Sequence, residues 1–173
     1  MGQLFSSVFN GYDFKDDLAA IFADCMVNNL IMIDNQQLLK VYISYDKLII
    51  KKYIKSLEAN LTEILKGNGV SKVKILEKYK LPEQYTPAVW FENYKESIKN
   101  ELFDYDYVFF TMFKGSEFSF IDENTLSVVV PENPIYKLKE MEFINILDKI
   151  ANERFSYNIK FTVSYKEATK SRY

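Results

Sequence analysis

The apolar and polar positions of this chain form the same succession twice. In residues 30–44 and again in residues 118–130, apolar and β-branched residues flank a short polar stretch. Each stretch is typical of two strands joined by a tight turn. The two stretches align at an offset of 88, which matches Val41 with Val129. The pattern therefore indicates a repeated unit built around a β-hairpin.

A helix is expected after each hairpin. In the first, apolar residues recur at alternating spacings of four and three and form one stripe. These residues are Ile50, Ile54, Leu57, Leu61 and Ile64. Asp46 is the expected N-cap, and Gly67-Asn68-Gly69 is the expected end, because glycine accepts the left-handed conformation. The second stripe consists of Phe143, Ile146, Leu147 and Ile150, and Pro134 suits its first turn.

A third strand is expected to close each unit, at Val73–Ile75 and at Phe161–Tyr165, where apolar and polar residues alternate. Helical patterns also precede both hairpins. In the first unit they cover Leu4–Phe9 and Asp13–Asp24. In the second, one helix starts at Thr86-Pro87 and another covers residues 105–113, ending at Lys114-Gly115. The sequence therefore predicts an α+β protein of two small tandem modules, each with the order helix(es)-β-β-α-β.

The expected boundary between the modules is a stretch with two prolines, Pro82 and Pro87, which interrupt regular structure and stiffen a linker. We expect a first module over residues 1–80, a linker over 81–87, a second α+β module over 88–165 and a flexible polar tail over 166–173.

Composition narrows the classes of function. The 173 residues are 48% hydrophobic, which suffices for packed cores, and the net charge of −2 argues against a chain built mainly to coat nucleic acid. The charge is uneven, at +2 in residues 1–80 and −4 in residues 81–173. Cys25 is the single cysteine, which suits a reducing cytoplasm. No apolar run is long enough to span a bilayer, so a cytoplasmic protein without a membrane partner is expected.

No catalytic, metal or cofactor site is expected in this chain. Histidine is absent, which removes the commonest general base and metal ligand. Two groups of carboxylates remain. One is Asp13, Asp16, Asp17 and Asp24. These acids lie next to an expected helix N-terminus, where they offset the helix dipole. The other group is Asp104 and Asp106, where Tyr105-Asp106-Tyr107 is interpreted as the start of a helix.

Two surface features are candidates for binding. Lys47, Lys51 and Lys55 recur at a spacing of four, and with Lys52 they form a basic stripe that would contact phosphates or an acidic partner. The alternative is a solvated helix face. Phe110 points away from Phe109 and Phe113 on a helix, so it is a candidate exposed aromatic at a partner interface.

The order α-α-β-β-α-β in about 80 residues resembles a type II KH-like arrangement. It is similar to the N-terminal domain of the replication initiator DnaA and to the C-terminal domain of the clamp-loader tau subunit. Residues 27–33 and 39–49 resemble the opening module of PolC-type DNA polymerases of Gram-positive bacteria. So do Trp90-Phe91-Glu92, residues 124–130 and residues 158–161 of the second module. A KH domain reads nucleic acid through a GxxG loop, whereas Gly67-Asn68-Gly69 is GxG and follows the wrong helix.

The resemblance implies that the intact protein is a bacterial DNA polymerase III of the PolC type, a transferase with a 3′–5′ exonuclease. In that family the catalytic domains lie downstream of a segment like this one. The chain itself is then the non-catalytic N-terminal region, which makes protein–protein contacts in DNA replication, with the clamp-loader tau subunit as the first expected partner. The alternative is a KH-like module that binds single-stranded nucleic acid weakly through the lysine stripe.

Overall fold

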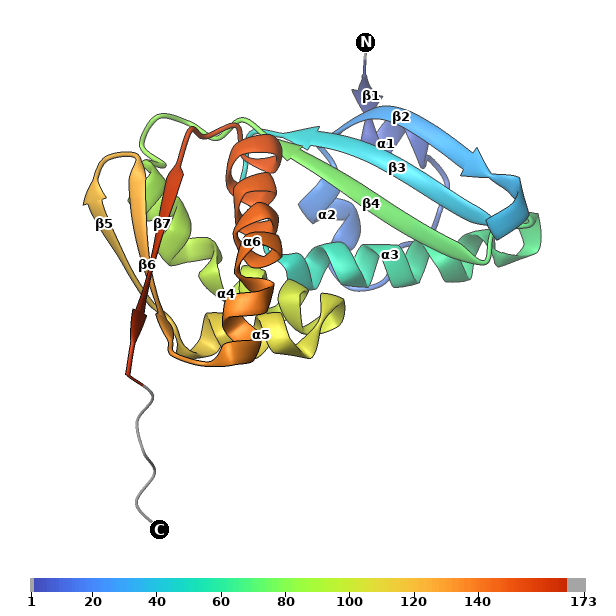
Figure 1. Cartoon of the computed structure of the whole chain (residues 1–173). Coiled ribbons are helices and arrows are strands. Elements are labelled where there is room, and N and C mark those ends of the chain that lie inside the picture. The colour runs from blue at the N-terminus through green and yellow to red at the C-terminus, as the bar shows by residue number, and fades with distance from the viewer. Residues whose placement is uncertain (1, 168–173) are drawn as a thin grey trace. The chain divides into compact units, whose positions relative to one another are not determined.

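The chain folds into two compact units, the first ending at Pro82 and the second beginning at Glu83. The computed structural model describes residues 2–167. Each unit contains its own small mixed sheet covered by helices, as Figure 1 shows. The expected α+β class is therefore confirmed. We refer to the two parts as unit 1 and unit 2.

Unit 1 contains a four-stranded sheet in the order β1-β2-β3-β4. Its elements are β1 (Gln3–Leu4), α1 (Phe5–Val8), α2 (Leu18–Phe22), β2 (Met26–Ile33), η1 (Asp34–Gln36), β3 (Leu38–Tyr45), α3 (Lys51–Leu65), η2 (Lys66–Asn68) and β4 (Lys72–Tyr79). Strands β1, β2 and β3 pair antiparallel, and β4 pairs parallel to β3. The parallel pair requires a crossover, and α3 supplies it.

The core of unit 1 lies between the sheet and α3, which packs on β4. Ile54, Leu57 and Leu61 of the expected stripe are buried, together with alternate residues of β3 and β4. The two ends of the stripe differ from the expectation. Ile50 is the N-cap position and is exposed, and Leu65 rather than Ile64 is the last buried residue of the helix.

The limits of α3 match the sequence at one end only. The expected N-cap Asp46 is wrong, because α3 begins at Lys51 and no side chain caps it. The expected end is confirmed, since Gly69 adopts the left-handed conformation with φ of 81° directly after η2. The expected helix over residues 13–24 is reduced to α2. Asp16 has a positive φ of 53°, which is incompatible with a helix through that position.

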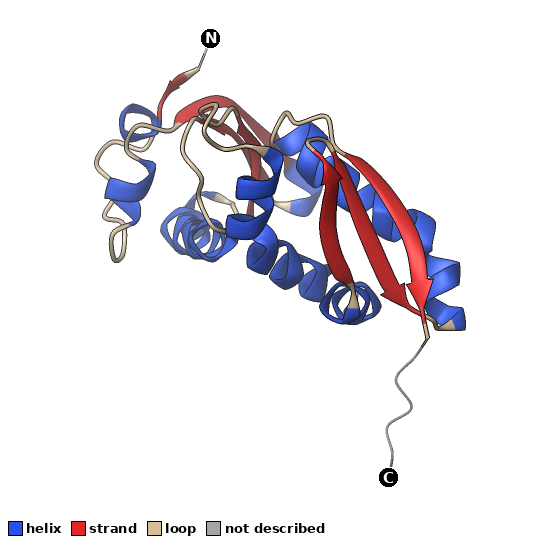
Figure 2. Ribbon diagram, turned by 90° about the vertical axis from the view of Figure 1, so that its left-hand side faces the viewer, coloured by secondary structure: helices blue, strands red, loops and turns tan. Residues whose placement is uncertain are grey.

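Unit 2 contains a three-stranded sheet in the order β5-β6-β7. Its elements are α4 (Pro87–Tyr105), α5 (Tyr107–Gly115), β5 (Glu117–Asp122), β6 (Thr125–Pro131), α6 (Pro134–Asp148), the π-helical η3 (Lys149–Arg154) and β7 (Lys160–Lys166). β5 pairs antiparallel with β6, and β7 pairs parallel with β6. Figure 2 shows the three strands side by side with helices behind them.

The helices of unit 2 begin where the sequence predicts. Thr86 caps α4, and its Oγ1 accepts a hydrogen bond from the Val89 amide at 3.3 Å, with Pro87 in the first turn. Pro134 opens α6 after the cap residue Asn133. The core is rich in large aromatic side chains, and Trp90 is 1% exposed among them.

The flexible tail expected over residues 166–173 differs at its start, because Lys166 still belongs to β7. The rest of that expectation, over residues 168–173, lies outside the described residues.

The two hairpins match at a different offset from the expected 88. In the structure, Leu39 pairs with Val73, and Leu126 pairs with Phe161. Leu39 of β3 therefore corresponds to Leu126 of β6, at an offset of 87 residues. Val73 of β4 corresponds to Phe161 of β7, at an offset of 88 residues. The match of Val41 with Val129 is therefore wrong: Val41 is fully buried, whereas Val129 is only half-buried on the opposite face of its sheet. A shift of one residue exchanges the two faces of a strand.

The helices within residues 2–167 are short or carry charged residues along their length. None of them combines the length and the apolar character that a membrane-spanning helix requires.

Candidate functional site

The expected lysine stripe on α3 does not form a single exposed surface. Lys51 is 5% exposed, and its Nζ lies 2.8 Å from Oε1 of Glu77 on β4. Tyr79 Oη donates to the other oxygen of Glu77 at 2.8 Å. Because α3 begins at Lys51, this side chain lies one turn before Ile54 on the inner face of the helix. Lys51 is therefore part of the core of unit 1 and cannot contact a ligand there.

The other three lysines of that group lie in different surroundings. Lys47 precedes the helix, and its Nζ is 3.9 Å from Asp24 and 5.7 Å from the centre of the Tyr45 ring. Lys55 is half-buried and has interacting neighbours, and Lys52 is exposed. Of the four lysines of the expected stripe, Lys47 and Lys52 are exposed, and only Lys52 lies on α3 itself.

A denser group of lysines lies on the sheet of unit 1, on the face opposite the core. We call this face, built from alternate residues of β2, β3 and β4, the open face. It carries Ile31, Ile33, Leu38, Lys40, Tyr42, Ser44, Lys72, Lys74, Leu76 and Lys78. Every one of these residues is exposed or half-buried, whereas the residues between them on β3 and β4, such as Val41 and Ile75, face the core.

Cross-strand pairing arranges the open face in rows. Lys40 lies directly beside Lys74, and Tyr42 lies beside Leu76 in the next row. Lys72 and Lys78 occupy the rows at the two ends of β4. The single acidic residue of these strands, Glu77, points into the core with 1% of its side chain exposed. The open face therefore presents four positive charges around one tyrosine, and no carboxylate of the three strands lies on it.

These lysines are not neutralised by neighbours. Within residues 2–167, none of Lys40, Lys72, Lys74 and Lys78 forms an ion pair. Lys40 and Lys74 lie side by side as like charges, an arrangement that is unfavourable in the absence of an anion. The open face therefore has the charge pattern of an anion-binding surface. Alternation in Lys72-Val73-Lys74-Ile75 is the sequence signal that would have located it.

Phe110 belongs to an aromatic cluster at the junction of α4 and α5. Its ring lies 5.2 Å from Phe103 and 5.6 Å from Tyr107, measured between ring centres. Phe110 itself is half-buried, but Phe103 is 54% exposed and Tyr107 is 63% exposed. The expected exposure of Phe110 is therefore only partial, and its ring packs against two more exposed rings in a group that we call the aromatic cluster: Phe103, Tyr107 and Phe110.

The sharp turn at Asp106 produces this cluster. Asp106 has an extended backbone and caps α5, and its Oδ1 accepts a hydrogen bond from the Val108 amide at 2.9 Å. This hydrogen bond, together with Lys139, holds the pKa of the Asp106 carboxyl below its ordinary value. The structure therefore confirms the interpretation of Asp106 as the start of a helix. Phe103 and Tyr107 come together because one helix ends and the next begins between them.

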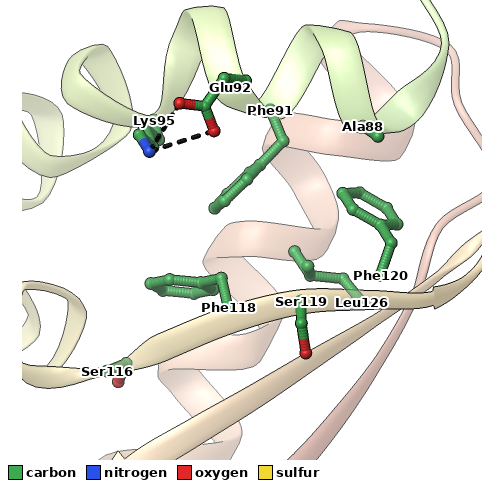
Figure 3. A pocket seen from close by; sticks show the side chains of 9 residues that line it. All are labelled: Ala88, Phe91, Glu92, Lys95, Ser116, Phe118, Ser119, Phe120 and Leu126. Carbon is green, nitrogen blue, oxygen red and sulfur yellow. Dashed lines mark hydrogen bonds and ion pairs between the residues drawn. The ribbon is translucent and has the colours of Figure 1, made fainter.

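A groove also opens in unit 2 between α4 and β5, with a volume of about 370 Å³. Figure 3 shows Phe91 pointing from α4 toward Phe118 and Phe120 of the strand. The ion pair between Lys95 and Glu92, at 3.0 Å, lies on the helix side of the groove. Its lining combines three phenylalanines with alanine, leucine, two serines and the Lys95–Glu92 pair, and it contains no set of groups arranged for acid–base or nucleophilic chemistry.

The acidic residues do not converge. Among the described residues, no group of three or more Cys, Asp or Glu side chains is placed to hold a metal ion. Cys25 is fully buried; desolvation, and secondarily the charge of Glu77, raises the pKa of its thiol to about 12. A thiol with that pKa is a poor nucleophile at neutral pH.

Comparisons of the chain with protein-family models, with curated proteins and with solved structures find no match.

Proposed function

We propose that this chain is the non-catalytic N-terminal interaction region of a PolC-type DNA polymerase III, and that it makes protein contacts in a bacterial replisome. The observation that carries the proposal is the β-β-α-β order in both units, with the last strand parallel to the middle one each time. In unit 2 two helices precede this order. That succession resembles the type II KH-like arrangement and is similar to the order that we expect of the interaction domains of DnaA and of the tau subunit.

The aromatic cluster of unit 2 is the contact surface we propose for a protein partner. Aromatic residues dominate the binding energy of many protein interfaces, and they are rarely left exposed in groups without a role. Phe103 and Tyr107 are both more than half exposed, and the ring of Phe110 packs against both of them. The clamp-loader tau subunit is the first candidate partner, and the sliding clamp and the helicase loader are the others.

Calorimetric titration of the purified chain with each of these three proteins tests the proposal. Binding to at least one is expected, and the double variant Phe103→Ala/Tyr107→Ala should weaken it by at least about tenfold, because interface aromatics commonly contribute about 2 kcal/mol or more. Tyr53→Ala, at an exposed tyrosine of unit 1, is the matched control and should bind normally. A folded chain that binds none of the three proteins would contradict the proposal.

The reading frame that follows Tyr173 provides an independent test. A continuation that encodes a polymerase supports the assignment, and a stop codon directly after Tyr173 rejects it.

The alternative function, a KH-like module that binds single-stranded nucleic acid, loses the surface that the sequence predicts for it. Lys51 is buried, and Gly67-Asn68-Gly69 ends a helix rather than forming a GxxG clamp. Contact with nucleic acid in this chain would therefore require a different surface.

A further inference from the structure

We propose that the open face of unit 1 binds the sugar–phosphate backbone of single-stranded nucleic acid. This inference goes beyond the protein contacts proposed for unit 2, and it does not depend on them. It rests on the side-by-side lysines of β3 and β4 and on the tyrosine between the lysine rows.

The spacing of the lysines suits an extended polyanion. On β4, Lys72 and Lys74 are two residues apart, which is about 6.6 Å along a strand, and Lys78 extends the line to about 20 Å. Lys40 widens this line beside Lys74 on the neighbouring strand, about 4.8 Å away. A phosphate chain running along β4 therefore meets a positive charge in three of the four rows.

The row without a lysine contains Tyr42 and Leu76. Tyr42 is half-buried and therefore partly accessible at the centre of the open face. A base of a single strand can stack on such a ring, whereas the bases of a duplex are already stacked on each other. An acidic protein surface would use the lysines but would gain nothing specific from the tyrosine. The combination of charge and ring therefore favours a single strand over a duplex and over an acidic protein.

The sheet of unit 2 shows that a lysine-rich open face is not a general result of this strand arrangement. The equivalent face there pairs Ser127 with Thr162 and Val129 with Ser164. Its Lys166 is 2.9 Å from Glu117 and is therefore neutralised, and its other lysine, Lys160, stands alone in the row with Thr125 at the opposite end. The two units thus present different chemistry, and only the sheet of unit 1 offers unpaired lysines in adjacent rows within the described residues.

The test is fluorescence anisotropy of the full chain with a short labelled oligo(dT) over a series of salt concentrations. Four phosphate contacts give a slope of log K against log salt of about −3, since each contact on a single strand contributes about −0.7. The variant Lys40→Gln/Lys74→Gln should reduce the slope to about −1.4. Lys52→Gln/Lys66→Gln removes the same charge from the region of α3 and should leave the slope near −3.

The tyrosine is tested separately, because a charge effect alone does not distinguish a single strand from any polyanion. Tyr42→Leu should weaken oligo(dT) binding by about tenfold and leave the salt slope unchanged, whereas Tyr53→Leu on α3 should bind normally. Oligo(U) should bind as well as oligo(dT), because neither the phosphate contacts nor stacking reads the 2′-hydroxyl.

Five results would overturn the proposal, of which the first four concern affinity and competition. These four are absence of binding at low salt, equal loss in the α3 control variant, equal affinity for duplex DNA with no effect of Tyr42→Leu, and equal displacement of the oligonucleotide by poly-glutamate. A preference above tenfold for oligo(dT) or oligo(U) would also contradict it. Circular dichroism melts of each variant establish that the loss of binding is measured on folded protein.

Discussion

Lys51 and Glu77 form an ion pair inside unit 1, with Nζ 2.8 Å from Oε1 and side chains that are 6% and 1% exposed. Charges are seldom buried to this degree without a partner, because desolvation of each costs several kcal/mol. Tyr79 donates a hydrogen bond to the second oxygen of Glu77. The ion pair thereby links the first turn of α3 to β4, at two positions where a pair of apolar side chains would also pack.

Breaking this pair on one side should strongly destabilise unit 1. Lys51→Met leaves the Glu77 carboxylate buried without its cation, and the expected loss is about 3–5 kcal/mol of unfolding free energy. The double variant Lys51→Met/Glu77→Leu should be markedly more stable than the single one, because no unpaired charge remains. Urea denaturation followed by circular dichroism measures both. Lys52→Met, next in sequence but exposed, is the control and should change stability by less than about 0.5 kcal/mol.

Gly69 and Gly67 should respond in opposite ways to a methyl group. Gly69 has φ of 81°, so Gly69→Ala forces alanine into the left-handed region at a cost of about 1–2 kcal/mol. Gly67 has no such constraint, and a Cβ built there meets nothing within 4 Å. Gly67→Ala should therefore be neutral or stabilising by up to about 1 kcal/mol. Equal effects of the two changes in thermal melts would contradict the assigned end of α3.

The cap at Asp106 should make unit 2 sensitive to acid. The folded-state pKa of this carboxyl lies below its unfolded value, so its stabilising contribution is complete above the unfolded pKa and is lost as the pH falls through the folded pKa. Asp106→Ala should therefore lower the melting temperature at neutral pH, and the difference from the native chain should shrink in acid. A difference that persists unchanged at pH values below the folded pKa would argue against this role.

Cys25 should be inert toward thiol reagents in the folded chain. Raising the pKa of the thiol from 9.0 to about 12 reduces the thiolate fraction near neutral pH about a thousandfold. Iodoacetamide at pH 8 should label Cys25 rapidly in urea and very slowly without it, as followed by mass spectrometry. Since the unfolded thiol ionises first, stability should fall as the pH rises from 9.0 toward 12. Fast labelling of the folded chain would mean that Cys25 is accessible.

The arrangement of elements was largely predictable, because it depends on local patterns. The caps Thr86 and Asp106, the stop at Gly69 and the stripe through Ile54, Leu57 and Leu61 all act within a few residues along the chain. Each of these signals is complete in the sequence. The structure therefore agrees with the expected elements where their limits are set by such signals.

The candidate surfaces were less predictable, because they depend on contacts between distant residues. Lys51 is buried only because Glu77 meets it from β4, 26 positions later. The open face likewise requires the register that sets Lys40 beside Lys74. A helical spacing of lysines was visible in the sequence and proved misleading. The spacing of two in Lys72 and Lys74 was equally visible, but its meaning depends on which face of β4 the core occupies.

The offset between the repeats illustrates the same limit. Val41 and Val129 match in the sequence, yet one lies in a core and the other does not. Periodicity alone identifies a strand without fixing the partner of each residue.

Trp90 is the only tryptophan of the chain, and it is buried within unit 2. Its fluorescence emission therefore reports on the folding of unit 2, because unit 1 contains no tryptophan. Lys51 belongs to unit 1, which has no tryptophan, so far-ultraviolet ellipticity is the signal that registers the effect of its loss directly. Disagreement between these two spectroscopic signals is thus expected under conditions where unit 1 has unfolded and unit 2 has not, and it would identify a partly folded state with only unit 2 intact.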